Sequence, residues 1–272
     1  MAHKKFGRIA TSPLRLLPDF LIVGAARCGT SSLYHYLCQH PSIGRAQTKE
    51  VHYFDVNYDK SSLWYRAHFP TIGAKWLHGA DGKPFVTGEA TAYYLFHPHV
   101  PKRVFGLMPD VKVIALLRNP IDRAYSHYQR SVRRGREKMT FEEATQTEAD
   151  RLRDETDKII RDGNYRSRIH RQLSYLARGI YADQLKLWLD FFPRRQLLIV
   201  RSEDFFTDIG GTLGQIQNFL GIRYFDIEDR KTYKKGIYTK MEPATRRRLV
   251  EYFAPHNERL KQLLDRDFGW DQ

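Results

Sequence analysis

The sequence predicts a single α/β domain in which helices flank a central parallel sheet. Three observations lead to this prediction. Apolar runs of strand length recur along the chain, helical patterns separate them, and a glycine-bounded loop joins the first run to the first helix. That first run is residues 20–23, the loop lies between Gly24 and Gly29, and the helix opens at Thr30. At 272 residues the chain is long enough for one full-sized domain.

The predicted elements follow one another in the alternating order that is typical of a parallel sheet. The sharpest helix start after the first is at residue 120, where Asn119 suits the N-cap and Pro120 the first helical position. The expected strands are residues 20–23, 85–90, 111–117 and 196–200, and the expected helices are 30–37, 101–107, 120–134, 181–192, 213–220 and 242–264.

Two segments fall outside this alternation. Residues 1–17 are basic and poorly patterned, and we expect them to be a mobile lead-in to a domain at 18–272. Residues 135–170 are the most charged part of the chain. Apart from a short helix with a capping box at 140–143, we expect them to form a mobile insertion that acts as a lid or recognition loop.

The loop after residue 23 predicts a phosphate site. Main-chain N–H groups converge where a glycine-bounded loop enters a helix, and the helix N-terminus attracts anions. The spacing of Gly24 and Gly29 imitates a nucleotide-binding P-loop, but Thr30 replaces its lysine. Arg118 follows the strand at 111–117, where a nucleotide hydrolase needs a metal-binding aspartate. These departures favour a phosphate site without a metal ion; an ordinary strand-to-helix turn is the alternative.

Charge and cysteine content narrow the class of protein further. Lys and Arg total 45 against 31 Asp and Glu, and a net charge of +14 indicates an anionic partner. Nucleic acid is one such partner, but the sequence has no finger spacing, heptad zipper or RNP-type strand. Cys28 and Cys38 are the two cysteines, and both are expected to be free thiols. With no signal-peptide core or membrane-length run, we expect a cytoplasmic location; the Golgi lumen is the alternative if an anchor was removed.

Four motifs, in order along the chain, resemble those of the PAPS-dependent sulfotransferases, particularly the heparan sulfate and carbohydrate branch. The sequence GAARCGTSSL at 24–33 is similar to the family's loop for the 5′-phosphosulfate, and RNPIDRAYS at 118–126 to its 3′-phosphate signature. KEVHYFD at 49–55 looks like a third family segment, and Lys235-Gly236 with DFGW at 267–270 also match. The resemblance covers most of the chain and implies the sulfotransferase fold, with PAPS as co-substrate and no metal ion.

The resemblance also assigns roles to residues. Glu50 would be the catalytic base, Arg27 would stabilise the leaving oxygen in place of the usual lysine, and His52 would assist. Asp55 and Glu89 are predicted to contact the acceptor. The residues that would bind the nucleotide are Arg27, Cys28, Gly29, Thr30, Ser31, Ser32, Arg118, Ser126, Lys235 and Gly236.

The acceptor is less well defined by sequence. A hydroxyl on a carbohydrate or polar metabolite, including an anionic glycan, is the main expectation. Ala90 stands where glycosaminoglycan enzymes tend to have a lysine, which weakens the case for a heparan-like acceptor. A small natural product, a lipid or an amine is the alternative acceptor, and a polyanion- or nucleic-acid-binding module without chemistry is the alternative from another class.

Overall fold

The computed structural model describes residues 7–78, 84–229 and 239–270. Within them, five strands form one all-parallel sheet in the order β2-β3-β1-β4-β5. Every residue of the central strand is buried, as expected for a strand that is covered on both faces. The strands are β1 (Phe20–Gly24), β2 (Ile43–Arg45), β3 (Val86–Ala90), β4 (Lys112–Leu117) and β5 (Leu197–Arg201). The predicted α/β class and its four predicted strands are confirmed, and the structure adds the short strand β2.

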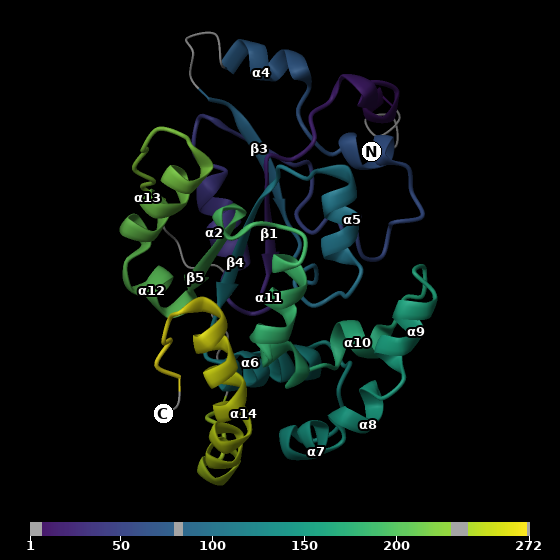
Figure 1. Ribbon diagram of the computed structural model, residues 1–272, viewed down its shortest axis with the longest axis vertical. Helices are drawn as coiled ribbons and strands as arrows, with labels where there is room; N and C mark the ends of the chain where they lie inside the picture. The colour runs from purple at the N-terminus through teal and green to yellow at the C-terminus, as the bar shows by residue number, and fades with distance from the viewer. Residues whose placement is uncertain (1–6, 79–83, 230–238, 271–272) are drawn as a thin grey trace.

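The helices surround this sheet (Figure 1). In the view of Figure 1, α12 and α13 lie beside one edge of the sheet and α5 beside the other, with α11 in front. The helices expected from sequence are α2 (Thr30–Leu37), α5 (Val100–Leu107), α6 (Pro120–Arg133), α11 (Tyr181–Leu189), α13 (Ile209–Leu220) and α14 (Pro243–Leu264). The structure adds α3 (Ser62–Arg66), α4 (Ile72–His78) and α12 (Ser202–Thr207).

The insertion is helical, which corrects the expectation of a mobile segment. It contains α7 (Phe141–Gln146), α8 (Glu148–Leu152), α9 (Glu155–Arg161) and α10 (Arg168–Gln172), grouped at the end of the molecule near α6 (Figure 1). The capping box at Thr140 and Glu143 is confirmed. Buried carboxylates hold the group together: Glu148 accepts the N–H groups of residues 175–177, and Glu155 accepts hydrogen bonds from Tyr165 and Ser167.

The basic lead-in is also bound to the domain from residue 8 onward. Arg8 Nε donates to the carbonyl of Ala67 at 2.7 Å, and the buried Arg15 donates from Nη1 to the carbonyl of Phe69 at 2.7 Å. The expectation of mobility is therefore wrong for this part, because the arginines that suggested solvent exposure hold main-chain carbonyls. The thiols of Cys28 and Cys38 are free, as predicted. None of the helices among the described residues has the length and apolar character needed to cross a bilayer.

Candidate active site

The loop between β1 and α2 has the geometry of an anion cradle. Gly29 has φ 93°, and α2 begins directly after it at Thr30. A Cβ at Gly29 would also lie 2.9 Å from the ring of Phe206, so this position requires glycine. The first N–H groups of a helix have no partner within it. The cradle therefore offers main-chain donors from Thr30 and the residues that follow.

Arg118 and Ser126 meet at this cradle although 91 and 99 residues separate them from Arg27. Asn119 caps α6 by accepting N–H groups with its side chain, which places Arg118 between the end of β4 and the start of α6. Arg27 Nε donates to Ser126 Oγ at 3.1 Å, and Arg118 Nη1 lies 3.5 Å from the carbonyl oxygen of Arg27. The structure thus brings these three predicted residues together.

Two other residues of the loop contribute in different ways. The hydroxyl of Ser32 is buried and has no hydrogen-bond partner among the described residues, so it can receive or donate a further bond. The Cys28 thiol lies 3.9 Å from the Tyr181 hydroxyl, and burial raises its pKa to about 11. The side chain of Cys28 is therefore part of the core, and only its main chain, held by Ser202 Oγ at 2.9 Å, belongs to the loop.

The segment that carries Glu50 and His52 has an unusual backbone. Both residues have positive φ, 58° for Glu50 and 57° for His52, as does Arg27 at 76°. Non-glycine residues in this region cost free energy, and they persist where the surroundings hold them in place. Their concentration at three predicted catalytic positions supports a functional site here.

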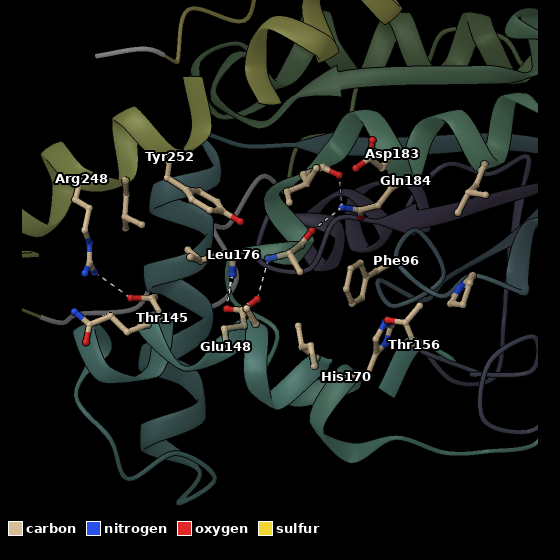
Figure 2. A pocket seen from close by; sticks show the side chains of 18 residues that line it. Phe96, Thr145, Glu148, Thr156, His170, Leu176, Asp183, Gln184, Arg248 and Tyr252 are labelled. Carbon is tan, nitrogen blue, oxygen red and sulfur yellow. Dashed lines mark hydrogen bonds between the residues drawn. The ribbon is translucent and has the colours of Figure 1, made fainter. Parts of the chain in front are cut away.

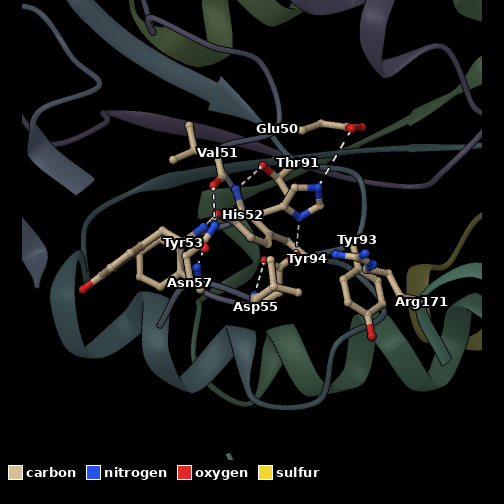
Figure 3. A network of polar contacts seen from close by, with 12 residues as sticks. Glu50, Val51, His52, Tyr53, Asp55, Asn57, Thr91, Tyr93, Tyr94 and Arg171 are labelled. Carbon is tan, nitrogen blue, oxygen red and sulfur yellow. Dashed lines mark hydrogen bonds and ion pairs between the residues drawn. The ribbon is translucent and has the colours of Figure 1, made fainter. Parts of the chain in front are cut away.

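The end of β3 holds this segment through a hydrogen-bond network, part of which Figure 3 shows. The N–H of Glu50 donates to the carbonyl of Ala90 at 3.0 Å, and that of His52 to Thr91 Oγ1 at 3.4 Å. The N–H of Tyr53 donates to the Tyr94 hydroxyl at 2.8 Å. The main chain around Glu50 is therefore positioned by the last residue of β3 and by residues that follow it.

Glu89 lies beneath this network, which corrects its predicted role. It is 0% exposed, and its carboxylate accepts hydrogen bonds from Tyr65 and Tyr94 hydroxyls at 2.7 and 3.0 Å and from Thr91 at 2.7 Å. It also accepts the N–H of Val51 at 3.3 Å. An acceptor cannot reach Glu89, because the protein surrounds both carboxylate oxygens; it holds the segment of Glu50 instead.

Asp55 is likewise behind the site rather than in contact with an acceptor. Its side chain is 0% exposed, and Oδ2 accepts a hydrogen bond from His52 Nδ1 at 2.7 Å (Figure 3). A carboxylate only accepts, so Nδ1 carries the proton and Nε2 faces Glu50, 4.0 Å from Oε2. The prediction that Asp55 contacts the acceptor is wrong for this reason, and Asp55 orients His52.

The charges around Glu50 and His52 shift the pKa values of both side chains. Burial raises the pKa of Glu50, but Lys49, His52 and Arg130 outweigh burial, and the pKa lies below its ordinary value. Burial lowers the pKa of His52, but its hydrogen bond to Asp55 and the charges of Asp55 and Glu50 raise it above its ordinary value. Lys49 Nζ is 3.4 Å from Glu50 Oε1, so Glu50 pairs with this lysine as well as contacting His52.

Glu50, His52 and Arg27 line one cavity of about 210 Å³. Five arginines that also line this cavity were not predicted from the sequence: Arg130, Arg134, Arg136, Arg171 and Arg178. One signal was present in the sequence: Ser126, Arg130 and Arg134 recur every fourth residue, the spacing of one helix face. Arg136 and Arg171 lie at the two ends of the insertion and Arg178 lies between α10 and α11, so only the tertiary fold brings them to the cavity.

His127 forms a further part of this wall. Burial and the charges of Arg178, Arg123 and Arg27 lower its pKa well below the ordinary value, so the ring is neutral. Its Nδ1 is buried and has no partner among the described residues. The predicted residues Lys235 and Gly236 lie outside the described residues.

A family model for the sulfotransferase domain matches residues 17–248. The chain belongs to the sulfotransferase domain family. It is also similar to a crystal structure of a sulfotransferase from Alicyclobacillus acidocaldarius, with 34% identity, 94% of this chain and 100% of that chain covered, and a TM-score of 0.73. The structure of mouse sulfotransferase SULT7A1 in complex with PAP is 15% identical in sequence, with a TM-score of 0.51. The match covers 94% of this chain and 88% of the mouse chain, and at this identity it shows the fold alone.

Two curated relatives extend this similarity. Human heparan sulfate glucosamine 3-O-sulfotransferase 3B1 is 32% identical over 94% of this chain. The membrane-associated sulfotransferase kil1 of Dictyostelium discoideum is 27% identical over 94% of this chain. The sulfotransferase chain spans 65% and 67% of the lengths of these two relatives.

Proposed function

We propose that this sulfotransferase moves the sulfuryl group of PAPS to a hydroxyl of an anionic carbohydrate. One observation supports the proposal most directly: the Glu50 carboxylate and the Arg27 guanidinium line one arginine-rich cavity, and Arg27 also contacts Ser126 beside the phosphate cradle. A base, a cation and an anion-binding surface are the groups that transfer from a phosphosulfate to a hydroxyl requires.

The cradle fits the nucleotide of PAPS. The N–H groups of Gly29, Thr30 and Ser31 at the start of α2 suit the 5′-phosphate, and the unpartnered hydroxyl of Ser32 is a further donor. Arg118 and Ser126 suit the 3′-phosphate, because a guanidinium offers two parallel donors to phosphate oxygens. PAPS supplies the sulfuryl group when bound, and Lys235 with Gly236 stays a sequence prediction for its clamp.

Glu50 and Arg27 would carry out the transfer step. The acceptor oxygen forms a new bond to sulfur while the bond from sulfur to the phosphate oxygen breaks. Glu50, ionised because its pKa is lowered, takes the proton of the acceptor hydroxyl. Arg27 offsets the negative charge that grows on the leaving oxygen, and it acts by charge alone because a guanidinium keeps its protons.

The walls of the cavity favour an anionic acceptor. Arg130, Arg134, Arg136 and Arg171 line the same cavity as Glu50, so an acceptor that approaches Glu50 through this cavity meets several cations. Ala90, where the resemblance led us to consider a lysine, is fully buried at the end of β3 and adds no charge to this cavity. The curated human relative is a heparan sulfate enzyme, which agrees with an acidic glycan as acceptor.

A transfer assay with labelled PAPS tests this proposal. Acidic glycans such as heparan-type oligosaccharides, the same sugars without their charged groups, and simple phenols would be compared as acceptors. We expect label in the acidic glycans, little in the neutral sugars, and PAP to compete with PAPS far better than ATP does. Transfer only to phenols or neutral sugars would contradict the anionic acceptor, and binding of the glycans without transfer would contradict the enzyme.

A further inference from the structure

A second cavity, of about 680 Å³, lies apart from the transfer site. It is enclosed by the helical insertion on one side and by α11 and α14 on the other (Figure 2). Leu152 comes from α8, Leu187 from α11, and Leu249 and Tyr252 from α14. Its volume falls in the range of pockets that hold a drug-sized ligand.

The wall of this cavity is mainly apolar. Besides these side chains, Phe96, Leu176 and Ile180 contribute apolar surface. Protein interiors are packed densely, and a space of this size with apolar walls stays open to apolar molecules. The cavity is therefore suited to a ligand with an apolar body.

The buried polar groups of the cavity already have partners. Glu148 accepts the N–H groups of Tyr175, Leu176 and Ala177 at 2.7–2.8 Å, as Figure 2 shows in part. Gln184 is also buried and donates to main-chain carbonyls, while the exposed Asp183 at the rim is paired with Arg259 at 2.7 Å. Because both carboxylates already have hydrogen-bond donors or a cation as partners, neither requires a cationic ligand.

Arg248 gives one end of the cavity a positive charge. It is exposed, its Nη2 donates to Thr145 Oγ1 at 3.2 Å, and among the described residues no carboxylate oxygen lies within 4.0 Å of it. Figure 2 shows Arg248 and Thr145 at one end of the cavity and Phe96 and Thr156 at the other. An elongated ligand that lies along the cavity would therefore meet a cation at one end only.

We propose that this cavity binds a small amphiphilic anion, a molecule with an apolar chain or ring system and a single carboxylate or sulfate group. The apolar body lies between Leu152 of the insertion and Leu187 and Leu249 of the long helices. The anionic group pairs with Arg248 at the rim. This site is independent of the proposed transfer reaction, and no bond is made or broken in it.

A wall separates the ligand from the transfer site. The ring of His170 stacks on Phe96 with centroids 4.3 Å apart, and its Nδ1 is 2.7 Å from the hydroxyl oxygen of Tyr93. Tyr93 lines the arginine cavity, and Arg178 lies over the rings of both Tyr93 and Phe96. Among the described residues, none lines both cavities, and these side chains lie between them, so PAP should not displace the amphiphile.

Decanoate and anilinonaphthalene sulfonate are suitable probes, because each joins an apolar body to one anionic group. We expect saturable binding of both to the folded protein, by calorimetry and fluorescence respectively, with each displacing the other and PAP displacing neither. Arg248→Gln should weaken decanoate binding about tenfold or more, the loss expected for a hydrogen bond to a charged group. The same change should leave decanol binding unaltered. Arg247→Gln, at the exposed neighbouring position, is the matched control and should change neither.

A second variant tests the location without relying on charge. Ala149 lines the cavity from an exposed position on α8, so Ala149→Trp should fill the space while leaving the fold intact, as circular dichroism would verify. This variant should lose binding of both probes. Retained binding in Ala149→Trp, equal decanoate affinity in Arg248→Gln and the native protein, or competition by PAP would each overturn the proposal.

Discussion

The carboxylate of Glu89 accepts the main-chain N–H of Val51, which lies between the two positive-φ residues Glu50 and His52. A buried acid on β3 thus fixes the backbone that carries the proposed base. The same carboxylate binds the hydroxyl of Thr91, whose oxygen in turn receives the N–H of His52. The proposed catalytic geometry therefore depends on a residue that no substrate can reach.

Glu89→Gln is expected to lower turnover and leave nucleotide affinity almost unchanged. Both carboxylate oxygens of Glu89 accept hydrogen bonds from hydroxyl or N–H groups. In the variant an amide NH₂ group would replace one of these oxygens, so one hydrogen-bond donor would face another. The free energy of unfolding should fall by about 1–3 kcal/mol, the cost of leaving a buried polar group unsatisfied. The measurements are kcat with saturating PAPS, PAP binding by calorimetry, and thermal unfolding.

Glu155→Gln provides the matched control for this change. Glu155 is also buried and accepts hydrogen bonds from hydroxyl groups, but it holds the insertion rather than the segment of Glu50. It should lose comparable stability with little change in kcat per folded molecule. Equal losses of kcat in the two variants would show that Glu89 matters only for folding.

The sheet and the cradle could be predicted because local signals specify them. The apolar run before Gly24 has the length of a buried strand, Gly29 takes the positive φ that the turn needs, and Asn119 with Pro120 starts α6 in a way that places Arg118. These signals act within a few residues. The meeting of Arg118, Ser126 and Arg27 then follows from the parallel pairing of β1 and β4.

The rest could not be predicted, because burial of charge is decided by distant partners. Glu89 and Glu148 each look like a solvated acid in sequence, yet both are buried. Glu89 accepts hydrogen bonds from Val51 and Tyr65, and Glu148 accepts the N–H groups of residues 175–177. The same ambiguity hid the helices of the insertion. Arg178 lines the cavity from the segment between α10 and α11, where no local pattern indicated it, while the spacing of Arg130 behind Ser126 was a signal present in the sequence.

Arg118→Ala is expected to weaken PAP binding by about 1.5–3 kcal/mol, the range for hydrogen bonds to charged groups. Its side chain is partly exposed beside the cradle, so the fold should remain nearly intact. Arg195→Ala removes the same charge from an exposed position just before β5, at the opposite end of the strands, and should leave PAP affinity unchanged. If calorimetry shows equal losses of PAP affinity in both variants, Arg118 contributes only through the net charge of the protein and not through direct contact with the phosphate.

Arg134→Gln is expected to raise the KM for an acidic glycan acceptor about tenfold or more, with PAP affinity unchanged. The reason is that Arg134 lines the same cavity as Glu50 and would pair with a sulfate or carboxylate of the glycan. Arg133→Gln is the control, since Arg133 is its exposed neighbour and does not line the cavity. Steady-state kinetics of both variants would be measured with charged and uncharged acceptors. If Arg134→Gln raises KM equally for both acceptors, Arg134 does not recognise the anionic group.

The pH dependence of kcat/KM distinguishes the two residues that could act as base. The pKa of Glu50 lies below its ordinary value of 4.5, so Glu50 is ionised at neutral pH and loses its basicity only as the pH falls through that lowered pKa. The pKa of His52 lies above 6.5, so His52 is protonated below that pKa and could accept a proton only at higher pH. With Glu50 as base, the acid limb of the profile should therefore lie below pH 4.5.

Two substitutions complete this test. Glu50→Gln keeps the shape of the side chain and removes its basicity, so turnover should fall at least about a hundredfold, within the usual contribution of general-base catalysis. His52→Ala should cost less and leave the acid limb in place, because His52 supports Glu50 through a contact at 4.0 Å. An acid limb above pH 6.5 that disappears in His52→Ala, together with a Glu50→Gln enzyme that keeps most of its turnover, would transfer the role of base to His52.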